Sequence, residues 1–287
     1  DGDGLRPIIV SSFLAKLAGA SIWRSAKPTC SKSQYALQKK RGAEIIIHKA
    51  REHYIAENAI IRVDVSNAFN SASRSKIRRL LEDVDPDVLT FFRTMYVPKA
   101  TLALFGKDET AFFNFEEGVR QGDAFSGYFF CLLMDAVIMQ FKEECDEGTT
   151  DIMSYMDDLT ITCLPQDVAR VSAAIATALE NWGFTINRSK SAVIAQPHIV
   201  LPDGIFPRAP NDRRFTMLGA NINDRFDDFN ALQIEKLQKF FEKIDQLEVH
   251  PHLKFTMLRL CGSPKLVYYA RTTPPQHSIT VIQFFDV

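Results

Sequence analysis

The chain has 287 residues, of which 46% are hydrophobic and 24% are charged, and its formal net charge is −1. This length and hydrophobic content allow a substantial buried core in one or two domains, so an intrinsically disordered chain is excluded. The charge is unevenly distributed, because residues 1–63 contain 11 Lys and Arg against 5 Asp and Glu, whereas the remaining residues contain 23 against 30. A basic first quarter could hold phosphates while a more acidic body holds cations, although ordinary surface variation would explain the same imbalance.

The cysteines and histidines show no spacing typical of a disulfide framework or a zinc site. Five cysteines are scattered along the chain without a Cys-x-x-Cys pair. His250 and His252 lie close together, but an exposed turn is the simpler interpretation because no third ligand is nearby. No apolar stretch reaches the roughly 18 residues that a membrane-spanning helix requires. We therefore expect an intracellular protein that makes no membrane contact.

The first half of the chain is expected to contain a buried strand followed mainly by helices. Residues 60–65 are rich in β-branched side chains, which predicts a buried strand that ends near Asp64. The further elements expected here, in chain order, are helices at 71–81 and 86–96, a strand at 101–105 and a helix at 127–145.

Two short apolar strands flank an acidic pair in the middle of the chain. Residues 152–155 and 159–163 enclose Met156-Asp157-Asp158, so we predict a β-hairpin with the acidic pair at its tip. The elements expected elsewhere in this half are helices at 168–182, 231–247 and 253–269 and strands at 191–195 and 215–222. Residues 197–213 are rich in Pro, Gly and Asp and are expected to form a loop between subdomains. Strands mixed with helices, without strict alternation, predict an α+β fold whose sheet has helices on one face.

Three carboxylates stand at the expected strand ends: Asp64, Asp157 and Asp158. If the strands are neighbours in one sheet, these side chains converge at its edge, and like charges at that distance need a cation. Oxygen ligands favour Mg²⁺ or Mn²⁺, and two such ions suit in-line phosphoryl transfer. Each residue taken alone is more simply a solvated strand end or turn, and only their joint setting beside apolar strands favours a site.

Tyr155-Met156-Asp157-Asp158 matches the Tyr-x-Asp-Asp box of reverse transcriptases. Other motifs that resemble this family surround the box in the family's order. They are the first palm motif at 63–70, the Arg-Gln-Gly-Asp motif at 118–123, the Gly…Asn…Lys segment at 183–190, the primer-grip position Leu218-Gly219 and the fingers segment Leu5-Arg6-Pro7-Ile8. Gln34 and Arg41-Gly42 resemble the stretch that follows in the fingers. The ordered match covers about residues 5–222, and the residues of its motifs are most similar to those of non-LTR (LINE-like) retrotransposon enzymes.

The resemblance implies a right-hand polymerase fold of the α+β class, with partial fingers, a palm sheet backed by helices, and a helical thumb. The expected domains are partial fingers at 1–59, a palm at 60–224 with a fingers insertion at about 75–117, and a thumb or thumb-like helical segment at 225–287. The implied activity is that of an RNA-directed DNA polymerase, the core of a retroelement enzyme. The implied partners are an RNA template, a DNA primer and dNTPs, in a nuclear or cytoplasmic ribonucleoprotein.

By the same resemblance, Asp64 and Asp157 would bridge two Mg²⁺ ions, for which Mn²⁺ could substitute. Asp158 would be an auxiliary metal ligand, and the Val65 carbonyl would complete the coordination shell of an ion. One ion would lower the pKa of the primer 3′-hydroxyl, and the other would neutralise the triphosphate and the leaving pyrophosphate. Lys190 would protonate the pyrophosphate as a general acid.

The resemblance also implies a nucleotide pocket. Phe69 falls at the family's steric gate, where a rigid ring would clash with a ribose 2′-hydroxyl and so favour dNTPs. Gln121 and Gly122 would line the pocket, since glycine allows close backbone approach. Arg6 would grip the triphosphate through bidentate bonds. Without the motifs, Phe69 is more simply a core residue, and Arg6 and Lys190 are surface charges.

Tyr155 and Met156 would pack beneath the primer end, with Leu218-Gly219 in the primer-grip hairpin. The family usually has Pro or Leu after Gln-Gly-Asp, whereas this chain has Ala124-Phe125-Ser126-Gly127, which predicts a more flexible loop. Two alternatives stay open. An RNA-dependent RNA polymerase is opposed by Phe69 and by the absence of a Gly-Asp-Asp box. A decayed or domesticated reverse-transcriptase domain that acts as an RNA-binding scaffold is opposed by the intact carboxylates.

Overall fold

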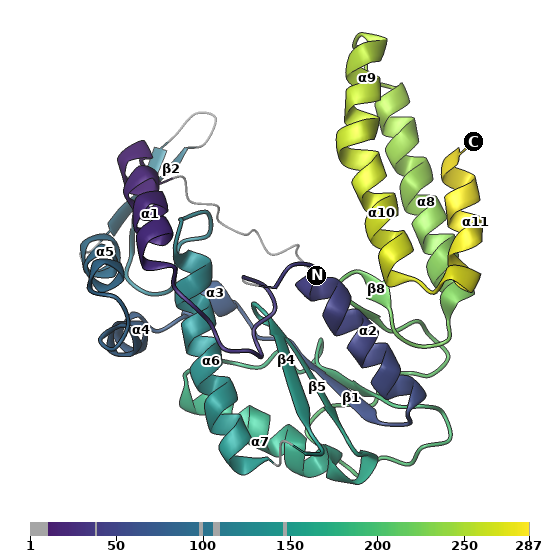
Figure 1. Ribbon diagram of the computed structural model, residues 1–287, viewed down its shortest axis with the longest axis horizontal. Helices are drawn as coiled ribbons and strands as arrows, with labels where there is room; N and C mark the ends of the chain where they lie inside the picture. Colours follow the sequence, from purple (N-terminus) through teal and green to yellow (C-terminus); the bar gives the residue numbers. More distant parts are fainter. Residues whose placement is uncertain (1–10, 38, 98–99, 106–109, 146–147, 287) are drawn as a thin grey trace.

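The computed structural model describes residues 11–37, 39–97, 100–105, 110–145 and 148–286 (Figure 1). At its centre is an antiparallel sheet of four strands in the order β4-β5-β1-β6. These strands are β1 (Ala59–Val63), β4 (Asp151–Tyr155), β5 (Asp158–Cys163) and β6 (Ala192–Ile194). Because β4 and β5 pair directly on either side of Met156 and Asp157, the predicted hairpin with the acidic pair at its tip is confirmed.

Helices cover both faces of this sheet, whereas the sequence predicted helices on one face only (Figure 1). Ile60 and Ile61 of β1 are both fully buried and belong to different cores. Ile61 packs in the core shared with α6 (Ser126–Glu144) and α7 (Val168–Asn181), and Ile60 in the core shared with α2 (Gly42–Ile55). A strand that is buried on both faces needs consecutive apolar residues rather than alternating ones, which explains the apolar run of β1.

Further helices and one hairpin lie beside α6, at one end of the sheet (Figure 1). They are α1 (Phe13–Ala26), α3 (Ala68–Ser71), α4 (Arg74–Leu81), α5 (Pro86–Tyr96), β2 (Ala100–Phe105) and β3 (Thr110–Phe115). The side chain of Asp85 accepts hydrogen bonds from the N–H groups of Asp87 and Val88, so α5 begins at the predicted Pro86. α1 and α4 pack against α5, and the strand predicted at 101–105 pairs with β3.

The C-terminal residues form a helical unit that projects from the sheet (Figure 1). Its elements are α8 (Phe226–Asp245), α9 (Pro251–Met257), η2 (Leu258–Gly262), α10 (Ser263–Thr272) and α11 (Pro275–Asp286). The break predicted near Gly262 and Pro264 is a π-helical turn at η2, after which Pro264 occupies the first turn of α10, where it costs little. In the described part of the chain, no helix combines the length and the apolarity needed to cross a membrane.

Side chains of α2 hold the base of this helical unit. Nη2 of the buried Arg51 lies 2.5 Å from the carbonyl oxygen of Asn221 and 2.8 Å from that of Thr272. His48 Nε2 lies 2.8 Å from the carbonyl oxygen of Arg271. Because Arg271 and Thr272 are the last residues of α10, these donors satisfy carbonyl groups that have no partner within the helix.

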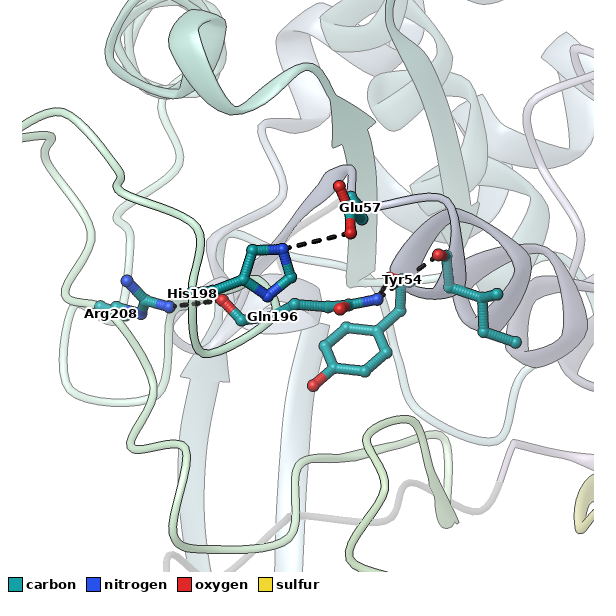
Figure 2. Close-up of polar contacts among 6 residues, drawn as sticks. Tyr54, Glu57, Gln196, His198 and Arg208 are labelled. Carbon is teal, nitrogen blue, oxygen red and sulfur yellow. Dashed lines mark hydrogen bonds and ion pairs between the residues drawn. The ribbon is translucent and has the colours of Figure 1, made fainter.

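After β6 the chain forms a loop and then a short hairpin of β7 (Thr216–Met217) and β8 (Ala220–Asn221). Figure 2 shows how the loop is fastened to the end of α2. Gln196 Nε2 donates to the carbonyl of Tyr54 (2.9 Å), and Arg208 Nη2 donates to the carbonyl of Gln196 (2.8 Å). His198 Nε2 lies 3.1 Å from Glu57 Oε1. The segment predicted as a loop between subdomains is therefore tied to the sheet and its helices.

Candidate active site

A cavity of about 1050 Å³ lies where β1 ends and the β4–β5 hairpin turns. The residues singled out from the sequence that line it are Asp64, Val65, Phe69, Gln121, Gly122, Met156, Asp157 and Lys190. The other lining residues are Ser66, Asn67, Ala68, Asn70, Ser126, Gly127 and Asn187. Segments that are far apart in the sequence therefore meet at one cavity.

Asp64 is held at this cavity by bonds to its backbone. Its N–H donates to Ser191 Oγ (3.0 Å), and its carbonyl accepts from the N–H of Asn187 (2.8 Å). Ser191 Oγ donates in turn to the carbonyl of Asn187 (2.8 Å). Because Ser191 is buried, water does not compete for these bonds, and they fix the segment that carries the half-buried Asp64 carboxylate.

Asp157 and Asp158 stand at the hairpin turn in different surroundings. Asp157 is half-buried and lines the cavity, next to Met156, whose backbone is left-handed (φ 56°). Asp158 is exposed, and it is not among the described residues that line the cavity. Of the three carboxylates expected to converge, Asp64 and Asp157 therefore share the cavity. Within the described ranges, no group of three or more His, Cys, Asp or Glu side chains is arranged to hold a metal ion.

Phe69 lies on α3 between the cavity and the core. Its ring stacks on that of Phe130 of α6, with centroids 4.6 Å apart and an angle of 12° between the planes. The ring of Phe130 meets that of Phe184 edge-on at 5.9 Å. Since Phe69 is only half-buried, packing against the core holds its ring while the side chain still lines the cavity.

The loop that carries Gln121 and Gly122 needs glycine at two positions. Gly118 (φ 76°) and Gly122 (φ 102°) have backbone conformations that L-residues rarely adopt. A Cβ atom on Gly118 would also lie 2.5 Å from the carbonyl oxygen of Asn70. The loop therefore passes close to α3, and its path depends on both glycines.

One buried and one partly buried polar contact hold the same loop from the side of α5. The hydroxyl of Tyr96 donates to Asp123 Oδ2 (2.8 Å), and Arg120 Nη2 donates to the carbonyl of Met95 (2.7 Å). Burial raises the pKa of Tyr96, and the adjacent Asp123 carboxylate adds to this effect. Tyr96 therefore stays a neutral hydrogen-bond donor at neutral pH.

The segment Ala124–Gly127, where the sequence departs from the family pattern, is packed. Phe125 is fully buried, and its ring centroid lies 5.1 Å from that of Phe91 and 5.3 Å from that of Trp23. α6 begins at the residue after Phe125. This packing opposes the flexibility that the sequence predicted, because the buried Phe125 ring anchors the segment to the core.

Lys190 is exposed and lines the cavity. Its carbonyl accepts from Arg62 Nη2 (2.6 Å), while Arg62 Nη1 donates to the carbonyl of Thr216 (2.9 Å). The Arg62 guanidinium also lies 5.3 Å from the ring centroid of Phe215. A single side chain of β1 therefore links the Lys190 loop to β7.

Leu218-Gly219 forms the turn of the β7–β8 hairpin, with φ values of 46° and 83°. The hydroxyl of Tyr268 in α10 donates to the Leu218 carbonyl, and burial raises the pKa of Tyr268 to about 12. Leu218 and Tyr155 pack against the same small hydrophobic cluster. Neither is among the described residues that line the cavity, whereas Met156 is.

Arg6, predicted to grip the triphosphate, lies outside the described residues. Three residues support the backbones of the site although the sequence predicted no such role for them: Ser191, Ser154 and Gln34, the last of which was placed only by its resemblance to the fingers stretch. Ser191 bonds to Asp64, and the other two bond to the hairpin turn. The sequence feature that could have identified such a residue is a small polar side chain within an apolar strand, as Ser154 is in β4.

Comparison with known proteins gives a consistent result. A family described as "Reverse transcriptase (RNA-dependent DNA polymerase)" matches residues 1–222. The retrotransposable element SLACS 132 kDa protein of Trypanosoma brucei gambiense is 25% identical over 293 residues, which cover 98% of this chain and 24% of that protein. The chain therefore spans about a quarter of this curated relative.

Two solved structures of telomerase from Candida tropicalis are similar in fold. The apo enzyme gives a TM-score of 0.53 at 14% identity, covering 79% of this chain and 44% of that one. The enzyme in complex with a TWJ fragment of telomeric RNA gives 0.50 at 14% identity, covering 95% of this chain and 50% of that one. The likeness concerns the fold alone, and it confirms the expected right-hand polymerase fold of the α+β class.

Proposed function

This chain belongs to the reverse transcriptase (RNA-dependent DNA polymerase) family, and we propose that it is the core of a retroelement enzyme that adds dNTPs to a primer 3′-hydroxyl on an RNA template. The observation that carries the proposal is the meeting of Asp64 and Asp157 at one cavity with Phe69 and Gln121. The match to a retrotransposon protein over 98% of the chain supports the retroelement origin.

The donor atoms at the cavity fit divalent magnesium. The Asp64 and Asp157 carboxylates and the Val65 carbonyl are oxygen ligands, the type that Mg²⁺ and Mn²⁺ prefer. Two carboxylates on one cavity repel each other, so a cation there would stabilise both in their charged form. We propose that they hold two Mg²⁺ ions, with the exposed Asp158 as an auxiliary ligand. Bound Mg²⁺ would activate the primer hydroxyl and neutralise charge on the triphosphate.

The remaining residues of the cavity would select and orient the nucleotide. Phe69 would lie under the sugar and exclude a 2′-hydroxyl, supported from behind by Phe130. Gln121 and Gly122 would line the nucleotide pocket, where the missing side chain of the glycine leaves room for the ligand. Lys190, exposed at the cavity, would donate a proton to the leaving pyrophosphate. Arg6 remains proposed as a triphosphate ligand from the resemblance alone.

The proposed domains are partial fingers at 1–59, a palm at 60–224 with a fingers insertion at about 75–117, and a thumb at 225–287. The helical unit α8–α11 supports the last of these. Tyr155, Met156 and Leu218-Gly219 would contact the primer and template. No disulfide joins any of the five cysteines, all of which lie in the described residues, and this supports an intracellular setting. A nuclear or cytoplasmic ribonucleoprotein is proposed from the resemblance alone.

Primer extension on poly(rA)/oligo(dT) with Mg²⁺ tests the proposal. We expect incorporation of dTTP in preference to UTP, and loss of incorporation in Asp157→Asn. Preferred incorporation of UTP would indicate an RNA polymerase instead. Binding of RNA without extension, by protein that includes flanking segments, would indicate a scaffold and contradict the proposed activity.

A further inference from the structure

Residues 33–35 lie along β4, the outer strand of the sheet. Gln34 forms a parallel bridge with Ser154 of β4. The N–H of Tyr35 donates to the Ser154 carbonyl (2.8 Å), and the N–H of Ser154 donates to the Ser33 carbonyl (2.8 Å). These main-chain bonds fasten the segment to β4 without any contribution from the Gln34 side chain.

The Gln34 side chain bonds both to its own segment, where its Oε1 accepts from the Ala36 N–H (3.1 Å), and to the hairpin turn that follows Ser154. Its Nε2 donates to Ser154 Oγ (3.0 Å), Ser154 Oγ donates to the Met156 carbonyl (2.9 Å), and the Met156 N–H donates to Gln34 Oε1 (3.2 Å). These bonds close a ring that engages both backbone polar groups of Met156. Gln34 is 1% exposed and Ser154 is 0% exposed, so both side chains of the ring are shielded from water, while Met156 is half-buried.

Met156 needs this support because its backbone is left-handed (φ 56°), a conformation that disfavours a residue with a long side chain. Its side chain is confined as well. The Met156 Sδ lies 3.5 Å from Cys131 Sγ, and a Cβ atom on Gly127 would lie 3.3 Å from the Met156 Cε. Asp157 is the next residue and lines the cavity, so the direction of its carboxylate depends on the torsions of Met156.

We propose that Gln34 is a positioning residue, which directs the Asp157 carboxylate by clamping the Met156 backbone together with Ser154. This inference rests on the proposed function, in which Asp157 holds Mg²⁺. Removing a residue that orients a metal ligand changes metal affinity or activity by about 10- to 100-fold. If Gln34 only fastened its own segment to the sheet, its loss would leave metal affinity unchanged in protein that still folds.

The test compares Gln34→Met and Ser154→Ala with the control Gln196→Met. Gln34→Met keeps the length of the side chain and removes both bonding groups. Ser154→Ala opens the ring by losing one hydroxyl, and it keeps the proposal testable if Gln34→Met does not fold. Gln196→Met removes an amide that donates to the Tyr54 carbonyl (Figure 2). Gln196 follows β6, whose Ile194 pairs with Ile60 near the start of β1, so it lies at the end of the sheet away from Asp157. Thermal denaturation followed by circular dichroism checks that each variant folds.

Two readouts separate positioning from folding. Electron paramagnetic resonance of free Mn²⁺ gives the Kd for the ion, and single-nucleotide extension gives kcat and the dNTP KM over a range of Mg²⁺ concentrations. We expect the Kd for Mn²⁺ to rise about 10-fold or more in Gln34→Met and Ser154→Ala, with no further rise in the double variant because one break opens the ring. At saturating Mg²⁺ the dNTP KM should stay near the wild-type value. Gln196→Met should match the wild type.

Unchanged Mn²⁺ affinity in the two folded variants overturns the positioning role, and so does an equal loss in Gln196→Met. If the wild type binds Mn²⁺ and the two variants lose affinity, but the wild type does not extend a primer, the positioning role stands and the proposed function fails. If the wild type does not bind Mn²⁺ at all, both are overturned.

Discussion

Val63 of β1 pairs with Leu159 of β5, and this register brings two acidic segments to the same end of the sheet. Asp64 follows Val63, whereas the turn that carries Asp157 comes just before Leu159. Because the two strands are antiparallel, the residue after the end of β1 and the residue before the start of β5 lie at the same end of the sheet, and both carboxylates line one cavity. Different hydrogen bonds hold the two segments, that of Asp64 through Ser191 and that of Asp157 through Gln34. A substitution can therefore disturb one carboxylate without disturbing the other.

Replacing Phe69 with Ala should relax discrimination between dNTPs and rNTPs. The ring that would exclude a 2′-hydroxyl is lost, and the preference for dTTP over UTP should fall by about 10-fold or more, the usual effect of removing one steric contact in a pocket. The ratio of kcat/KM values for the two nucleotides measures it. Phe184→Leu is the control, since Phe184 touches the other partner of the stack, Phe130, and is fully within the core. An unchanged ratio in Phe69→Ala would leave Phe69 as a core residue only.

Gly118→Ala should destabilise the fold and disturb the Gln121 loop. A left-handed backbone costs an L-residue about 1–2 kcal/mol, and the new Cβ atom would also lie 2.5 Å from the Asn70 carbonyl oxygen. Urea unfolding gives the change in free energy. Gly204→Ala is the matched control, because a Cβ atom there meets only atoms at 3.8 Å or more and the change should stay within about 0.5 kcal/mol. Equal losses in the two variants would contradict the role of Gly118.

Asp135 should make the fold less stable as pH rises above about 4. Burial raises the pKa of its carboxyl above the ordinary value of 3.8, although the N–H and the hydroxyl of Ser31 both donate to it. Between the two pKa values the folded protein binds more protons than the unfolded chain does. The contribution of Asp135 to stability is therefore fully present below the unfolded pKa of 3.8 and is lost as pH rises through the higher folded pKa.

Asp135→Asn removes this titration while it keeps one acceptor for Ser31. The free energy of unfolding of the wild type relative to the variant should therefore fall as pH is raised from about 3.5 to 7 in urea titrations. A relative gain for the wild type over the same range would show that the bonds from Ser31 outweigh the cost of burial.

The hairpin and β1 could be predicted because their signals are local. The apolar run at 60–65 and the two apolar strands around Asp157 each lie within two residues of the observed strands at both ends. The fold class followed from the order of the motifs, and it is confirmed. The roles of the site residues remain predictions, although most of them line one cavity.

α2 could not be predicted in the same way. Its Ile45-Ile46-Ile47 run is typical of a strand, because β-branched residues favour extended backbone. The helix is stabilised by contacts that no local pattern marks, since Ile46 and Ile47 are fully buried and Arg51 bonds to carbonyls of two distant segments. The Gln34 ring escaped prediction for the same reason, because it joins residues more than a hundred positions apart.

Addition of one dTTP to a primer on an RNA template, in Asp64→Asn, Asp157→Asn and the control Asp203→Asn, tests most directly whether the two carboxylates form one catalytic centre. Asp203 is exposed in the loop after β6 and should leave the rate unchanged. Each of the other two variants should lose about 1000-fold or more in kcat, since several kcal/mol of charge stabilisation disappear, and the double variant should be little worse than either. A rate near that of the wild type in either single variant would contradict a shared centre at Asp64 and Asp157.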